Sequence, residues 1–410
     1  MSVILWGENV AIRYSDILNT VDLNFNHFVE IRRQLHQYPE LGLQEFLTAE
    51  KIEEVCRNWG ILTGPRINKT SIVGIIKGNG KAGKNVGLRA DMDALPIQEQ
   101  KDVPYKSKRD GVMHACGHDV HMAIQLGAAF VLNGLKDHIP GDVKLLFQQA
   151  EETVGGAKTM IESGVLENPD VNYVLGMHVD PHIEVGQFGV KYRYAYASSD
   201  TIIIYVHGHS AHGAYPHEGV DAILIASNIV TALQTLVSRN TPPLDSAVLS
   251  FGRIEGGDAH NIIASHVKLT GTLRTLNKDI RNLLKSRIFE VATNIAKAYG
   301  GDVSLRVESG YDALYNDEYV TQIVENVASR VLGSDAVHVL ENPSLGVEDF
   351  AYFAKEVPSS YNRLGVANKK KGITTPVHDP GFNVDEECIR NGVLIQVLSV
   401  LALMGVEVRG

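Results

Sequence analysis

The chain has 410 residues, more than one ordinary domain contains and enough for two domains with separate cores. Apolar residues make up 44% and charged residues 21%, so the composition excludes a disordered or fibrous chain. The formal net charge of −10 argues against a protein that neutralises a phosphate backbone, and we expect no nucleic-acid partner.

The first half of the chain alternates strands and helices, which predicts an α/β sheet with helices on its faces. Helical spacing of apolar residues and runs of β-branched residues mark the elements. In chain order they are helices over Phe25–Gln37 and Thr48–Trp59, strands over Ser71–Ile76 and Val86–Ala90, a helix over His121–Leu135, and strands over Val143–Gln148 and Val171–Leu175.

After Val190 the element pattern changes to strand, helix, strand, strand, helix, strand, which is typical of a compact two-layer unit. We predict an inserted second domain over 194–308 and a discontinuous first domain over 1–193 and 309–410. The predicted elements of the insertion are Thr201–Val206, Val220–Ser238, Ala247–Ile254, Val267–Leu273, Asp279–Ala298 and Val303–Val307; helices over Glu318–Val331 and Glu348–Ala354 follow it.

We expect a cytoplasmic protein without a membrane partner. The first residues, Met1–Glu8, have no basic leader. The longest apolar stretch, Val393–Val406, is shorter than the ~20 residues that a membrane span requires, so it predicts a buried C-terminal helix. The three cysteines Cys56, Cys116 and Cys388 are too few and too scattered for a disulfide framework, which is typical of a reducing compartment.

The segment Met113–His121 contains a thiol, three imidazoles and a carboxylate within nine positions. Cys116 and His118 are separated by Gly117, and this spacing directs both side chains to one centre only in an irregular loop or at a strand end. Thiolate and neutral imidazole are good ligands for zinc and related metals. The cluster therefore favours a metal site over a structural cysteine beside polar loop residues.

Four further positions place carboxylates or imidazoles after predicted strands or in a late loop. They are the pair Asp91 and Asp93, the pair Glu151 and Glu152, His178, and His378. Side chains at strand ends can converge on one edge of a sheet, and one glutamate of a pair can bind a metal while the other takes a proton from water. Each position alone has an ordinary explanation, such as a solvated helix start or a packed polar histidine.

No glycine-rich phosphate loop and no Gly-x-Ser-x-Gly turn precedes a helix, which disfavours a nucleotide-binding protein and a serine hydrolase. Taken together, the motifs resemble the amidohydrolase branch of the aminoacylase and carboxypeptidase G family of dinuclear metallohydrolases. This branch includes hippurate hydrolase, indoleacetyl-amino-acid hydrolase and N-acetyl-diaminopimelate deacetylase. The matching segments are Arg32–Leu41, Leu88–Pro96, Met113–Asp119, Gln149–Glu152, Gly176–His178, Gly208–Gly213, His260–Ile262, Gly271–Arg274, Glu348–Phe350 and His378–Pro380.

The resemblance implies a role for each matched position. It makes Cys116, His118, Glu152, His178 and His378 the ligands of two divalent metal ions, with Cys116 as the bridge. The metals would be zinc or manganese, with cobalt or nickel as alternatives. Glu151 would be the general base and Asp93 would orient a ligand, whereas Asp91 stands where other branches have a ligating histidine.

In the inserted domain, the resemblance makes His212 a lid histidine that stabilises the oxyanion, and it makes Asn261 and Arg274 groups that hold the substrate carbonyl and carboxylate. It implies a metallopeptidase-like catalytic domain with an inserted ferredoxin-like lid that also forms a homodimer. In several relatives the lid histidine reaches the neighbouring subunit's metal centre.

The expected activity is hydrolysis of the amide bond of N-acyl amino acids, by a water that two metals activate and Glu151 deprotonates. One alternative is a metallo-carboxypeptidase or dipeptidase that acts on short peptides, because both substrates offer a carboxylate to Arg274. A second alternative is a binding protein that has lost turnover; it predicts a missing ligand or base, and the sequence retains all of them.

Overall fold

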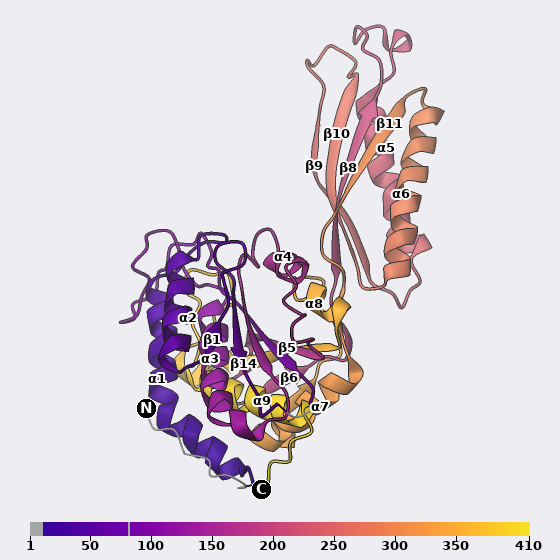
Figure 1. Ribbon diagram of the computed structural model, residues 1–410. Helices are drawn as coiled ribbons and strands as arrows, with labels where there is room; N and C mark the ends of the chain where they lie inside the picture. Colours follow the sequence, from indigo (N-terminus) through magenta and orange to yellow (C-terminus); the bar gives the residue numbers. More distant parts are fainter. Residues whose placement is uncertain (1–10, 81–82) are drawn as a thin grey trace. The chain divides into compact units, whose positions relative to one another are not determined.

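The computed structural model describes residues 11–80 and 83–410, and the chain divides into two compact units (Figure 1). The first unit contains the residues up to Arg193 together with Tyr315–Asn342 and Tyr352–Gly410. The second contains Tyr194–Leu314 and Pro343–Ala351. The expected N-terminal segment Met1–Glu8 lies outside the described residues.

The predicted end of the insertion at residue 308 is too early. The second unit continues to Leu314, and the backbone N–H of Ser199 in β8 donates to the carbonyl of Tyr311 over 3.0 Å. The predicted catalytic segment 309–410 is also interrupted, because the N–H of Ala197 donates to the carbonyl of Ser344 over 3.1 Å. Both contacts join residues that are distant in sequence, and a local sequence pattern cannot predict such contacts.

The first unit is built on an eight-stranded sheet with the order β1-β2-β4-β3-β5-β14-β6-β13. The strands β3, β4, β5 and β14 are parallel neighbours, so their carboxyl ends meet at one edge. β3 and β4 are buried along their whole length, which explains why most of their residues are apolar. The bounds are Leu62–Thr63 (β1), Ile72–Ile76 (β2), Val86–Asp91 (β3), Val143–Gln148 (β4), Tyr173–Glu184 (β5), Phe188–Val190 (β6), Val337–Val339 (β13) and Ser359–Ala367 (β14).

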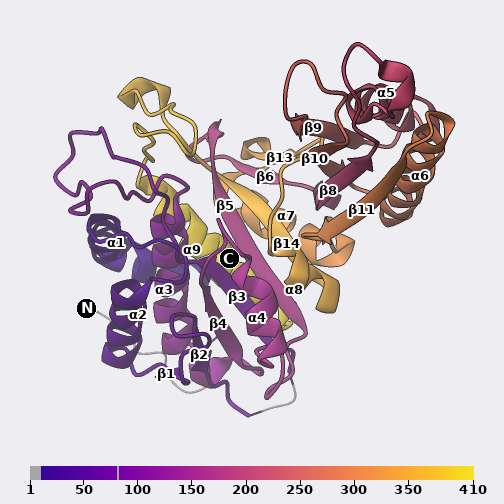
Figure 2. The ribbon, with the colours of Figure 1, turned by 90° about the horizontal axis from the view of Figure 1, so that it is seen from above.

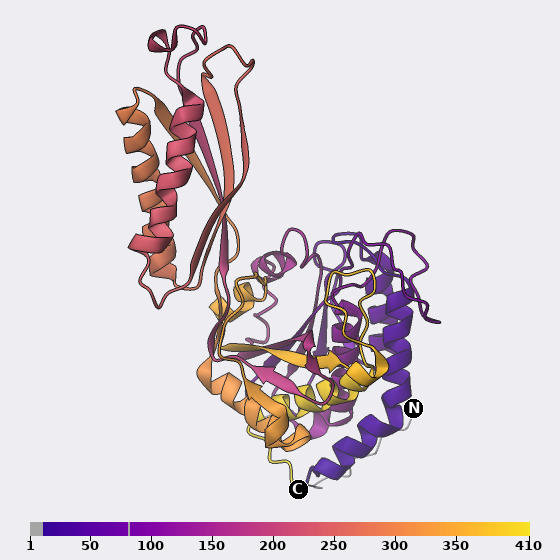
Figure 3. The same cartoon turned by 180° about the vertical axis from the view of Figure 1, so that it is seen from behind.

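The helices of the first unit pack in layers on this sheet. α3 and α9 contact the sheet directly, and α1 packs against both of them (Figures 2 and 3). The apolar C-terminal stretch lies in α9 as far as Leu403 and is buried there, as predicted. The bounds are Tyr14–Gln37 (α1), Phe46–Asn58 (α2), His118–Gly134 (α3), Gly156–Glu162 (α4), Glu318–Leu332 (α7), Ala351–Glu356 (α8, which begins in the second unit) and Glu387–Leu403 (α9).

The second unit has the element order strand, helix, strand, strand, helix, strand, and its four strands form an antiparallel sheet with the order β11-β8-β10-β9. α5 and α6 pack against each other and against this sheet. The bounds are Ser198–His207 (β8), Ala222–Thr235 (α5), Ala247–Gly256 (β9), His266–Thr275 (β10), Lys278–Ala298 (α6) and Asp302–Ser309 (β11). The short strands Arg193–Tyr196 (β7) and Leu314–Asn316 (β12) pair where the chain passes between the units.

One helical segment, Ala222–Asn240, is apolar enough and long enough at 19 residues to cross a membrane by length and composition. Its side chains Ile225, Ile229 and Leu233 are fully buried in the core of the second unit. A core helix passes the same test of length and composition, and we read the segment as one.

Candidate metal centre

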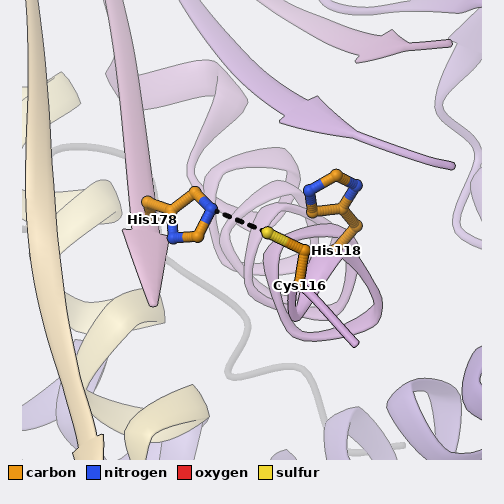
Figure 4. A group of neighbouring side chains, drawn as sticks. All are labelled: Cys116, His118 and His178. Atoms are coloured by element: carbon orange, nitrogen blue, oxygen red, sulfur yellow. Dashed lines mark hydrogen bonds between the residues drawn. The ribbon is translucent and has the colours of Figure 1, made fainter. Parts of the chain in front are cut away.

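Cys116, His118 and His178 form the first group of possible metal ligands (Figure 4). Cys116 lies in the loop before α3, Gly117 takes a left-handed conformation with φ of 86°, and His118 is the first residue of α3. His178 lies within β5, with its Nε2 atom 3.3 Å from the Sγ atom of Cys116. The ligand atoms of the three side chains all lie within 4.8 Å of one another, as donors around one cation must.

The same thiol belongs to a second group, with Glu152 and His378. The Nε2 atom of His378 lies 3.3 Å from Sγ of Cys116 and 3.1 Å from Oε1 of Glu152. His378 has a positive φ of 65°, and its backbone N–H donates to the carbonyl of Ala115 over 2.8 Å. This contact fixes the late loop on the loop that carries Cys116. Two groups that share one thiol are the arrangement expected for a bridged pair of cations.

Asp93 organises the turn that follows β4. Its two carboxylate oxygens accept hydrogen bonds from the backbone N–H groups of Glu151 and Glu152, each over 3.0 Å. Oδ1 of Asp93 also lies 3.4 Å from Nδ1 of His118. One carboxylate therefore sets the positions of a candidate ligand on α3 and of both glutamates. The carboxylate of Glu151 lies within 4.8 Å of ligand atoms of His118 and Glu152, close enough to act on a water there.

The charges of the site are arranged to receive cations. Burial raises the pKa of the Cys116 thiol well above its ordinary range, so this thiol needs a positive neighbour in order to ionise. Burial disfavours the charged form of His118, but the negative charge of Asp91 and the nearby carboxylate of Asp93 outweigh it and hold its pKa well above the ordinary value. Burial also acts on Glu152, yet the nearby ring of His378 and the charge of His118 lower its pKa.

Unpaired polar atoms test whether these residues fit a metal. Both ring nitrogens of His118 and Oε1 of Glu152 are buried and make no well-aligned hydrogen bond in the described part of the chain, although Asp93 and His378 lie close to them. Buried polar atoms are normally paired, and a coordinated cation satisfies them. Thiolate, imidazole and carboxylate donors together suit zinc and its neighbours in the first transition row. The residues therefore fit a pair of divalent metals.

A buried charge network lies behind the metal loop, in a segment that was matched in the sequence without a role. Asp119, fully buried next to His118, has its Oδ2 atom 2.7 Å from Nε of Arg32 and 2.7 Å from Nδ1 of His36. Nε2 of His36 lies 3.2 Å from Oε1 of Glu99. Burial acts against ionisation of Glu99, but its hydrogen bond with His36 and the charge of that ring lower its pKa to about 2.

The structure differs from the sequence prediction in one feature of the site. His178 does not end a strand, because β5 continues through it to Glu184. His121 was counted in the cluster without a role of its own. It lies one turn after His118 on α3, and its Nδ1 atom is 2.6 Å from Oδ1 of Asp91. Residues three apart on a helix lie on the same face, so the spacing of His118 and His121 could have indicated that His121 lies near the site.

The three predicted residues of the insertion lie in the second unit. His212 and Asn261 are exposed and close together, because His212 bridges to Ile262 and the N–H of Gly213 donates to the carbonyl of Asn261 over 2.7 Å. The N–H of Ala214 donates to Nδ1 of His212 over 3.0 Å. The remaining ring nitrogen, Nε2, then carries the hydrogen of the neutral ring and is available as a donor.

Comparison with known proteins gives the family. A model of peptidase family M20/M25/M40 matches residues 87–401. The N-acetyl-L-cysteine deacetylase of Bacillus subtilis is 41% identical over 88% of this chain and 84% of its own length. Thermostable carboxypeptidase 1 of Saccharolobus solfataricus is 38% identical over 90% of this chain and 93% of its own.

Among solved structures, the YXEP protein of Bacillus subtilis, described as a dinuclear metal-binding peptidase of the M20 family, superimposes with a TM-score of 0.83. It is 31% identical and covers 94% of this chain and 100% of its own. The predicted resemblance is thus confirmed, together with the mixed α/β fold of this family. The chain belongs to peptidase family M20/M25/M40 and is a hydrolase that acts on amide bonds.

Proposed function

We propose that the chain is an N-acyl-amino-acid amidohydrolase with two divalent metal ions in each subunit. The observation that carries the proposal is the pair of ligand groups that share Cys116, one completed by His118 and His178 and the other by Glu152 and His378. A single structural metal would need only one such group. The proposed metals are zinc or manganese, with cobalt or nickel as alternatives.

Each residue of the site has a distinct role in the proposed reaction. When bound by these residues, the metals would supply Lewis-acid polarisation of the amide carbonyl and would make a nearby water more acidic. Glu151 takes a proton from the attacking water on its carboxylate and returns it to the leaving amine. Asp93 is a positioning residue, because it holds the backbone of Glu151 and the ring of His118.

The substrate class follows from the relatives and from one basic side chain. One relative is named an N-acetyl-L-cysteine deacetylase and another a carboxypeptidase, and both kinds of substrate carry a free carboxylate beside the amide. In our proposal Arg274 binds this carboxylate and Asn261 binds the carbonyl oxygen. Nη1 of Arg274 is buried and has no hydrogen-bond partner among the described residues, and a substrate carboxylate would supply one.

We further propose that His212 and Asn261 act on the neighbouring subunit's substrate, as a lid within a homodimer. The N–H of Gly208 donates to the carbonyl of Ser265, so the loop with His212 lies at the start of β10. Arg274 lies near the end of that strand, eight residues after His266. At ~3.3 Å per residue this separation is about 26 Å, too long for one small substrate to touch both ends of the strand.

The surface of the second unit supports the proposed dimer. α5 exposes Ile223 and Leu224, each by nearly half of its area, and the edge strand β9 exposes Ile254. Unpaired strand edges beside apolar side chains are suited to pairing with another chain.

We also propose a cytoplasmic location, since all three cysteines are free.

A substrate screen with metal control tests the proposed activity. Protein stripped with a chelator is reloaded with zinc or manganese and offered N-acetyl, N-benzoyl and indoleacetyl amino acids beside dipeptides. We expect two metals per subunit and metal-dependent release of the amino acid from N-acyl substrates. Faster turnover of dipeptides would replace the amidohydrolase with the peptidase alternative, and a reloaded protein without metal or turnover would refute both.

Mixing two inactive variants tests the exchange of residues between subunits. Glu151→Gln removes the base from its own subunit, and His212→Ala removes the proposed lid donor from the partner's site. If His212 acts across the dimer, mixed dimers regain one intact site, so activity returns when subunits exchange. Labelled subunits that exchange without any return of activity would place His212 in its own subunit's site or outside catalysis.

A further inference from the structure

His121 is a buried histidine whose two ring nitrogens are both engaged. Its Nδ1 atom lies 2.6 Å from Oδ1 of Asp91, and its Nε2 atom accepts the backbone N–H of Val179 over 3.0 Å. A ring nitrogen that accepts an N–H cannot carry a hydrogen itself. The hydrogen of His121 therefore lies on Nδ1 and is donated to Asp91.

These bonds argue against a third metal site here. Asp91, His118 and His121 have ligand atoms within 4.8 Å of one another, as a cation requires. However, a cation at Nε2 of His121 would displace the N–H of Val179, which would be left unpaired in a fully buried place. Asp91 is also committed, because its Oδ2 atom accepts from Nη1 of Arg89 over 2.7 Å.

Val179 joins the strand and the loop that carry the first ligand group. Its carbonyl accepts a hydrogen bond from Nδ1 of His178 over 2.6 Å, and this bond turns Nε2 of His178 toward Cys116. Its side chain packs over Gly117, where an added Cβ would lie 2.4 Å from Cγ2 of Val179. The peptide groups on both sides of Val179 thus fix the ring of His178 relative to the thiol.

We propose that the pair Asp91–His121 is a positioning device for His178. It holds the N–H of Val179, so that the carbonyl of the same residue can orient the ligand's ring. This inference rests on the proposed metal centre. It predicts a selective defect, because His178 belongs to the group with Cys116 and His118 and not to the group with Glu152 and His378. Loss of His121 should weaken one metal position and spare the other.

Two substitutions of similar size separate positioning from ligation. His121→Gln can place its amide oxygen where Nε2 was and still accept the N–H of Val179. His121→Asn is too short for that bond, although it can still donate to Asp91. Partners of metal ligands typically contribute 10–100-fold to metal affinity. We therefore expect zinc titration against a competing chelator to give one of the two affinities reduced 10–100-fold in His121→Asn, and both affinities within a few-fold of the parent in His121→Gln.

The outcomes distinguish this inference from the proposed function. Unchanged affinities in His121→Asn, or equal losses in both variants, would overturn the positioning role while the parent still binds two metals. A parent that binds no metal would overturn the metal centre itself. A measurement on the unaltered protein avoids any defect in folding: with ¹¹³Cd bound and histidines labelled with ¹⁵N, we expect cadmium coupling to His118, His178 and His378, and a hydrogen on Nδ1 of His121. Coupling to His121 would make it a ligand and refute the inference.

Discussion

Replacement of Asp119 by alanine should destabilise the first unit strongly. The carboxylate is fully buried and lies 2.7 Å from the guanidinium of Arg32, whose side chain is 1% exposed. Removal of one partner of a buried pair costs about 3–5 kcal/mol, because the other charge remains without compensation. Glu386, 3.2 Å from Nη1 of Arg32, offsets part of this cost, so we expect about 3 kcal/mol at the low end of the range.

Urea unfolding followed by tryptophan fluorescence measures this loss. The sequence has tryptophans only at positions 6 and 59, so the signal does not come from the second unit. Glu162→Ala is the matched control: it breaks an exposed pair with Lys158, with atoms 3.8 Å apart, and should change stability by less than about 0.5 kcal/mol. A loss below about 1 kcal/mol in Asp119→Ala would refute the role of this network in stability.

The remaining predictions concern the metal centre and the charge network. Glu151→Gln should keep two metals and lose at least ~10²-fold in kcat, and activity within a few-fold of the parent would remove it from the role of base. Cys116→Ala should lose both metals in elemental analysis, because the thiol belongs to both ligand groups. Gly117→Ala should cost about 2–5 kcal/mol in urea unfolding, from the left-handed backbone and from the collision with Val179, and an unchanged midpoint would contradict this. The pKa of Glu99 is lowered to about 2, below its value in the unfolded chain, so its stabilising effect is present above about pH 4.5 and is lost on acidification. The difference in unfolding free energy between the parent and Glu99→Gln should therefore shrink by about 3 kcal/mol as the pH falls from about 6 toward 2, and a constant difference would argue against it.

Sequence patterns recover the central elements of the first unit best. β4 has the predicted bounds, and β3 extends the prediction by one residue, because buried parallel strands consist mainly of apolar residues. α1 begins at Tyr14, well before the predicted Phe25, since its first turns contain polar residues of low helix propensity and are stabilised by burial of Ile17 and Val21. β5 runs past the predicted end at Leu175 and through Pro181 to Glu184, and β14 pairs with it across an irregularity near Gly365.

In the candidate site, too, some features could be predicted from the sequence and others could not. The ligands stand in short motifs, so the resemblance could name Cys116 and His378 although 262 positions separate them. The bond between His121 and the backbone of Val179 could not be predicted, because it depends on the register of α3 against β5. The partners of Asp119, Arg32 and His36, likewise come from α1, and Glu99 joins the network through His36; only the packed structure brings these residues together.

The discontinuity of the first unit sets an order of events during synthesis. His178, the last residue of the first ligand group, leaves the ribosome about 200 residues before His378, which at ~5–20 residues per second is roughly 10–40 s. In this interval the second unit, nearly continuous in sequence, is complete and can fold on its own, whereas β5 still lacks its neighbour β14 and the sheet lacks its covering helix α9. The nascent chain therefore exposes the apolar face of β3 and β5 for many seconds, and a chaperone that binds this face would act before the second ligand group exists.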